Sequence, residues 1–131
     1  MSRFAEVIVL ARDAEEVMAP LTEPDSNREW HQRFTPIDDS KFSGEGASSE
    51  ECYMWVIQFY RHNWSGLLTY LEQIEWPDPS SVQVLIHDED DDCFGLWMMF
   101  DGVMREVPIP ATKREAFAGS PTGTLIRTDR G

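Results

Sequence analysis

The stretch that decides the fold is Val82–Ile109, VQVLIHDEDDDCFGLWMMFDGVMREVPI, which contains three strand-like runs. Residues 82–87 and 93–100 are rich in β-branched and aromatic side chains, as strands are, and an acidic turn separates them. Asp101-Gly102 is the strongest hairpin signal in the chain, because a type I′ turn needs a positive φ at both central residues. The sequence therefore predicts a meander of three antiparallel strands that ends with residues 103–109.

Two further strands are predicted upstream of this meander. Residues 4–11 (FAEVIVLA) are dense in β-branched side chains. Residues 52–61 (CYMWVIQFYR) are almost uniformly apolar, which is typical of a strand that is covered on both faces. The strand at residues 103–109 is expected at an edge of the sheet, since Pro108 and Pro110 cannot donate hydrogen bonds to a neighbouring strand.

Helix signals lie between these strands. In residues 64–75 the apolar side chains recur at helical spacing, with Asn63 as the expected N-cap. Asp13 is the expected N-cap of a helix of about two turns that Pro20 ends. A second capping box predicts a further short helix over residues 26–34, which Thr35-Pro36 would stop.

The fold class that follows is α+β. Residues 1–131 are expected to form a single domain, with a mostly antiparallel sheet of about five strands, a C-terminal meander and helices packed on one face. A helix between the strands at 52–61 and 82–87 makes that pair parallel if both lie in one sheet. Residues 38–50 read as a loop, and the small, polar residues 111–131 as a partly extended or flexible tail.

The charge of the chain is strongly negative. Its 131 residues include 24 acids and 11 bases, which gives a net charge of −13 and a pI near 4.4. This balance argues against binding to nucleic acid or to an anionic membrane, since both need a surplus of Lys and Arg. The N-terminal sequence lacks the features of a signal peptide, and no apolar run approaches the roughly 18 residues of a membrane span. We therefore expect a cytoplasmic protein.

The acids concentrate in one third of the chain. Between Arg61 and Arg105 there is no Lys or Arg, but there are nine acids. Eight of them fall into two groups: a helix-end patch around Trp76, with Glu72, Glu75 and Asp78, and an acidic turn of Asp88, Glu89, Asp90, Asp91 and Asp92. Since a single strand of about 20 Å separates the two groups, they are expected to flank one acidic surface.

Two interpretations of these acids stay open. They form either a solvated turn that keeps the protein soluble, or a docking surface that attracts a basic partner. Trp76 has two interpretations as well. It is either an exposed anchor for a partner or a packing residue that seals the end of the helix.

No catalytic motif is present, and neither an enzyme activity nor a cofactor is predicted. The acidic turn matches the first three ligand positions of an EF-hand calcium loop, but Cys93 stands where that loop needs Gly, so no metal site is predicted. Cys52 and Cys93 fit reduced thiols in apolar surroundings. The alternative to a binding protein is a small enzyme or ligand-binding domain that uses His62 and His87 in a cleft.

In its size, its acidity and its combination of acids with Trp76, the chain resembles the small immunity proteins that bacteria make against their own toxins. Such proteins are often acidic, because many of their toxin targets are basic nucleases. The resemblance implies an inhibitor that docks on and neutralises a basic protein partner, such as a nuclease toxin. The helix-end patch and the acidic turn would then be its partner-binding residues. Phage-encoded inhibitors that mimic nucleic acid share this character and remain an alternative.

Overall fold

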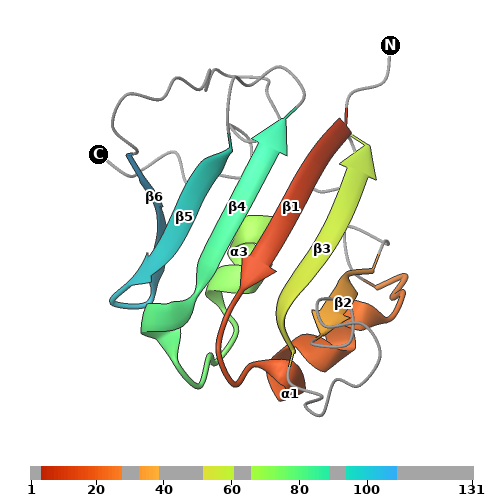
Figure 1. Ribbon diagram of the computed structural model, residues 1–131, viewed down its shortest axis with the longest axis horizontal. Helices are drawn as coiled ribbons and strands as arrows, with labels where there is room; N and C mark the ends of the chain where they lie inside the picture. Colours follow the sequence, from red (N-terminus) through yellow and green to blue (C-terminus); the bar gives the residue numbers. More distant parts are fainter. Residues whose placement is uncertain (1–3, 28–32, 39–51, 61–65, 89–93, 109–131) are drawn as a thin grey trace.

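The computed structural model describes residues 4–27, 33–38, 52–60, 66–88 and 94–108. They form a single antiparallel sheet of six strands with short helices, in the strand order β2-β3-β1-β4-β5-β6 (Figure 1). The elements in chain order are β1 (Phe4–Leu10), α1 (Glu15–Met18), the 3₁₀ turn η1 (Ala19–Thr22), β2 (Thr35–Asp38), β3 (Cys52–Tyr60), α3 (Leu67–Glu72), the 3₁₀ turn η3 (Pro79–Ser81), β4 (Gln83–Asp88), β5 (Gly95–Phe100) and β6 (Val103–Val107).

The first strand lies inside the sheet. β1 pairs antiparallel with β3 on one side and with β4 on the other, so β3 and β4 run parallel with β1 between them. β1 and β2 are likewise parallel, with β3 between them. This interleaving of two βαβ units is the ferredoxin-like arrangement, and the β5–β6 hairpin extends it. The predicted α+β class and C-terminal meander are confirmed.

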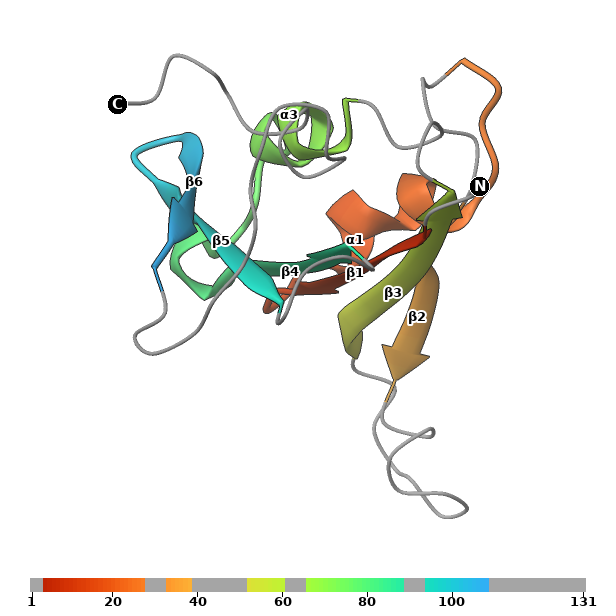
Figure 2. The same ribbon diagram turned by 90° about the horizontal axis from the view of Figure 1, so that it is seen from above.

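The core lies between the sheet and its helices. In β1 the alternate residues Ala5, Val7 and Val9 are buried, and they belong to one apolar cluster with Met18 of α1 and Leu71 of α3. Figure 2 shows α1 and α3 on the same side of the sheet, as predicted. No described helix lies on the opposite face. That face is therefore left open by the described elements.

The β5–β6 turn forms as the sequence predicts. Asp101 has a φ of 52° and Gly102 a φ of 81°, which are the two positive values of a type I′ turn. A Cβ on Gly102 would meet no atom within 4 Å, so the need for glycine there comes from the backbone conformation alone. β6 lies at the edge of the sheet, as its prolines predicted.

The short helices differ from the predictions. α1 begins at Glu15 with Ala14 at the N-cap position, and Asp13 instead takes a left-handed conformation with a φ of 56° in the preceding turn. Pro20 does end α1, and the chain continues as a 3₁₀ turn. α3 begins at Leu67 after Gly66, whose left-handed φ of 85° sets the start, and it ends at Glu72, three residues earlier than predicted.

β2 was not predicted. Thr35-Pro36 opens this strand, where the sequence had suggested only the end of a helix. Phe34 is buried and its N–H donates to the Leu21 carbonyl at 2.8 Å, which directs the chain onto the sheet. A proline is tolerated because β2 is an edge strand. The predicted helix at residues 26–34 and the predicted loop at residues 38–50 lie mostly outside the described residues. The predicted tail at residues 111–131 lies wholly outside them.

The prediction that β3 is covered on both faces is wrong. Trp55, Ile57 and Phe59 are buried on the helix side, whereas Gln58 is exposed and Val56 only half-buried on the other. Its apolar residues therefore form both a core face and part of the open face.

Candidate functional site

The helix-end patch is largely part of the fold. The side chain of Glu72 is only 8% exposed, and its Oε2 accepts the backbone N–H of Met104 at 2.7 Å. Met104 lies in the edge strand β6, so this N–H takes its acceptor from α3 rather than from a neighbouring strand. The expectation that Glu72 faces a partner is therefore corrected. Its carboxylate stabilises the sheet edge and blocks it against strand addition.

Trp76 is also buried. Its side chain is 7% exposed, and its indole Nε1–H donates to the Leu71 carbonyl at 2.9 Å. The chain turns back after α3, and the ring closes the end of the helix. The packing interpretation is therefore confirmed, and the interpretation of Trp76 as an exposed anchor is wrong.

Asp78 serves the turn that follows. Its Oδ1 accepts the Ser80 hydroxyl at 2.9 Å, and its carbonyl accepts both the N–H and the hydroxyl of Ser81, at 3.0 and 2.8 Å. Of the four residues in the helix-end patch, only Glu75 is exposed. This patch offers one free carboxylate rather than a docking surface.

Removal of the Glu72 carboxylate is expected to lower the free energy of unfolding. Glu72→Ala leaves the Met104 N–H without its acceptor, at a cost of about 1–3 kcal/mol. Glu72→Gln keeps an acceptor oxygen and should lose less. Urea unfolding measures both, with Glu75→Ala, at an exposed position, as the control expected to stay within about 0.5 kcal/mol of the wild type. Equal losses in Glu72→Ala and Glu75→Ala would contradict the role of the buried bond.

The acidic turn leaves the sheet at the other end of β4. Asp88 is the last residue of β4 and stands opposite Ala5, whereas residues 89–92 lie outside the described residues. Asp78 precedes the first residue of β4, so the two acidic groups begin about 20 Å apart, at opposite ends of one strand. Since the helix-end patch is mostly buried, the expectation that both groups flank one surface is not supported.

The described residues on either side of the acidic turn are in contact. The rings of His87 and Phe94 stack with their centroids 5.0 Å apart. The Nδ1 of His87 lies 3.2 Å from the Oε1 of Glu6 on the neighbouring strand β1. His87, which precedes the acidic run in the sequence, therefore contacts both Glu6 and Phe94.

A row of apolar side chains crosses the open face of the sheet. Ile8 of β1 pairs with Val56 on one side and Leu85 on the other, Leu85 pairs with Leu96, and Leu96 with Val107. All five are half-buried, and the neighbours of the first four along their strands are buried on the helix face. We call these five residues the apolar row. Contiguous apolar surfaces on proteins are often sites of interaction, so the apolar row is a candidate for one.

A polar row borders the apolar row toward the acidic turn. Glu6 pairs with Gln58 in β3 and with His87 in β4. On the other border, Leu10 pairs with Met54 on one side and with Gln83 on the other, so apolar and polar side chains meet there. The open face thus has an apolar centre and a polar margin on the side of the acidic turn.

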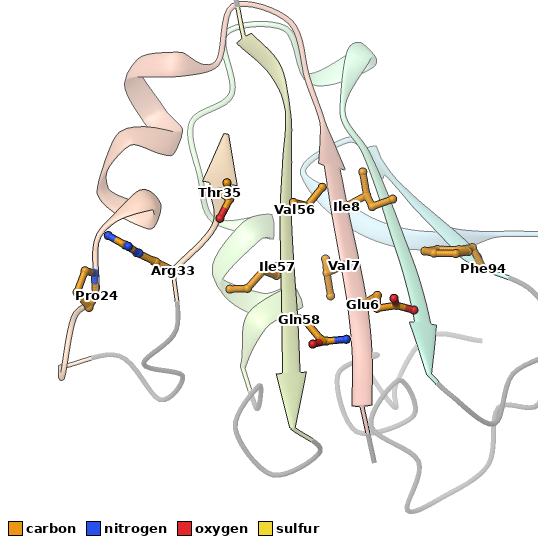
Figure 3. Close-up of a pocket in the computed structure, with 10 residues that line it drawn as sticks. All are labelled: Glu6, Val7, Ile8, Pro24, Arg33, Thr35, Val56, Ile57, Gln58 and Phe94. Carbon is orange, nitrogen blue, oxygen red and sulfur yellow. The ribbon is translucent and has the colours of Figure 1, made fainter. Parts of the chain in front are cut away.

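A hollow of about 600 Å³ lies over β3 and β1 in this region (Figure 3). Ile8 and Val56 of the apolar row line it, Glu6 and Phe94 stand at one end, and Arg33 stands at the other. Its volume is within the range of sites that bind small molecules or single side chains of a partner. None of these residues belonged to the predicted site.

Comparison with protein-family models, curated protein sequences and solved structures gives no match. The function is therefore inferred from the residues of the chain itself.

The residues of the predicted alternative, a catalytic or ligand-binding cleft, are only partly described. His87 contacts Glu6 and Phe94 of the hollow, but His62, its predicted catalytic partner, lies outside the described residues. In the described part of the chain, no three His, Cys, Asp or Glu side chains cluster as a metal site would require. Cys52 is buried, and its thiol donates to the Met54 carbonyl at 3.3 Å. Within the same residues, no helix has the length and apolarity to cross a membrane.

Proposed function

We propose that this chain is an acidic protein-binding inhibitor of the immunity type, which docks on and neutralises a basic protein partner such as a nuclease toxin. The observation that supports this best is the apolar row on the open face, bordered by a polar margin from which the acidic turn departs. The apolar row offers the contact area, and the turn offers the charge. This proposal keeps the acidic turn as a docking element and replaces the helix-end patch by the open face.

Electrostatic attraction would bring the partner to this face. The chain carries a net charge of −13, and five consecutive acids follow His87 in the sequence. In the described residues the only Lys or Arg side chains are Arg12, Arg33 and Arg105. A field of one sign raises the association rate with an opposite surface by about 10- to 1,000-fold.

Burial of the apolar row would hold the partner once it has arrived. Six strands at about 4.8 Å spacing and about 20 Å length give a flat footprint of about 500 Å². This is the order of area that one side of a small specific interface buries. An apolar centre with a polar rim is also the usual anatomy of such an interface.

The first test is neutralisation in cells. A bacterial host expresses the product of the gene next to the one that encodes this chain, alone and together with it. We expect that neighbouring product to arrest growth and this chain to restore it. A neighbouring product that is harmless, or that stays toxic when this chain is present, would contradict the immunity-type function. If the neighbouring product binds this chain but is not toxic, the alternative of a ligand-binding domain is favoured.

Binding to the partner is expected to depend strongly on salt. Attraction between surface charges acts over about 8 Å at physiological ionic strength and over about 3 Å at 1 M. The association rate, measured by stopped flow with the purified partner, should therefore fall at least about tenfold between low and high salt. A rate that stays flat over this range would remove electrostatic steering from the mechanism.

A further inference from the structure

The two ends of the hollow carry opposite charges. Glu6 stands at one end beside Phe94, and Arg33 stands at the other end, with the apolar side chains of Ile8 and Val56 between them (Figure 3). Glu6 belongs to β1, whereas Arg33 comes two residues before β2, which is two strands away in the sheet. Two strand spacings correspond to about 10 Å. The hollow is therefore an elongated site with an acidic end, an apolar floor and a basic end.

The acidic end has the chemistry of a cation site. The Glu6 side chain is 53% exposed, and among the described residues its Oε1 lies 3.2 Å from the Nδ1 of His87. Glu6 lines the hollow, so its half-exposed side chain is accessible from there. Gln58, the register neighbour of Glu6, adds an exposed amide, and Phe94 adds an aromatic ring. A carboxylate beside an aromatic ring attracts a cation through both its charge and the ring face.

We propose that this hollow receives an arginine side chain of the basic partner. The guanidinium would donate to the Glu6 carboxylate and lie against Phe94, and the apolar residues that follow the arginine in the partner would cover Ile8 and Val56. Arginine suits this site better than lysine, because its flat and weakly hydrated head both pairs with carboxylates and stacks on aromatic rings. The inference rests on the proposed function and specifies how the same face recognises its partner.

Arg33 adds a requirement at the other end of the hollow. A carboxylate of the bound segment would pair with this exposed side chain, about 10 Å from Glu6. An extended chain covers that distance in about three residues, at 3.3 Å per residue. The occupant is therefore an extended segment with an arginine, two apolar residues and then an acid. The Arg33 charge opposes the bound arginine only weakly, because the separation exceeds a Debye length of about 8 Å.

The test uses the full chain and a peptide probe. The ¹⁵N-labelled protein is titrated with acetyl-Arg-Leu-Leu-Glu-amide, and the amide shifts of the described strands are followed by NMR. The matched peptide carries citrulline, a neutral side chain of nearly the same shape, in place of arginine. We expect the arginine peptide to shift amides of β1 and β3 and to bind about tenfold more tightly than the citrulline peptide, since a charged hydrogen bond is lost.

Two variants distinguish the effect of the hollow on peptide binding from the effect of the overall charge. Glu6→Gln should weaken binding of the arginine peptide about tenfold and leave binding of the citrulline peptide unchanged. Glu75→Gln removes the same charge at an exposed position after α3, and it should change neither affinity by more than about twofold. Thermal melting of both variants confirms that they fold.

The peptide titrations test the arginine site, and the experiment in cells tests the proposed function, so either can fail alone. Equal binding of both peptides, equal effects of Glu6→Gln and Glu75→Gln, or shifts confined to α3 would each overturn the arginine site. If these occur while the chain still neutralises its partner in cells, the proposed function stands without the arginine site. If the peptide binds as expected and no partner is neutralised, the arginine site stands and the immunity-type function fails.

Discussion

Replacement of Trp76 by alanine should lower the free energy of unfolding by about 3–5 kcal/mol, because a large buried ring is lost from the core. The indole also donates to the Leu71 carbonyl at the end of α3, so part of the loss is the loss of this hydrogen bond. Urea unfolding measures the change. The partner's dissociation rate from the folded fraction should stay unchanged.

Trp76→Phe is the control for this prediction. It keeps an aromatic ring in the core and removes the Nε1–H, so we expect a loss of about 1 kcal/mol from the hydrogen bond plus a smaller packing term. If Trp76→Ala instead left unfolding unchanged and accelerated dissociation of the partner, Trp76 would be an interface anchor and its burial against Leu71 would have no energetic importance.

Neutralisation of the acidic turn should reduce the association rate with the partner by about one to three decades. The variant replaces Asp88, Asp90, Asp91 and Asp92 by Asn, which keeps side-chain size and turn propensity while it removes four charges. Stability should hold or rise slightly, since repulsion between neighbouring carboxylates is relieved. Stopped-flow association and urea unfolding on the same variant separate the two effects.

The matched control removes four exposed charges elsewhere: Asp13→Asn, Glu16→Gln, Glu75→Gln and Asp101→Asn. Asn is accepted at the two left-handed positions, Asp13 and Asp101, because it tolerates a positive φ. A control variant that slows association as much as the acidic-turn variant would show that only net charge matters. An acidic-turn variant that binds at the wild-type rate would leave the turn as a device for solubility.

The parts of the fold that local signals specify were predictable. Asp101-Gly102 fixes the β5–β6 turn, because few residue pairs adopt two successive positive φ values. The central place of β1 was not predictable, because it depends on pairings with β3 and β4, far away in the sequence. β2 was missed because Thr35-Pro36 is typical of a helix stop, and its place in the sheet depends on pairing with β3, which lies further along the sequence.

The candidate site was harder to predict than the fold. Glu72 and Trp76 were predicted at the surface because they belong to a cluster of acids in the sequence. Glu72 instead lies on the buried side of α3, and Trp76 is buried after the early end of that helix. The sequence does contain a sign of the open face, but we interpreted it as a strand covered on both faces. Ile8 and Val56 are apolar at strand positions that alternate with core residues. That pattern predicts a strand apolar on both faces, and it does not distinguish a second core from a surface that awaits a partner.

The central position of β1 determines the order in which the chain can fold. Its partners in β3 and β4 lie at least 44 and 73 residues further along the sequence. On the ribosome, β1 therefore waits until β4, at least 73 residues later, has emerged before both its edges can pair. Loop closure over such distances slows folding, and during that interval Val7 and Val9 remain exposed to other chains. Substitutions in β1 should therefore reduce the yield of the protein first through aggregation during synthesis, and only then through a lower stability of the folded state.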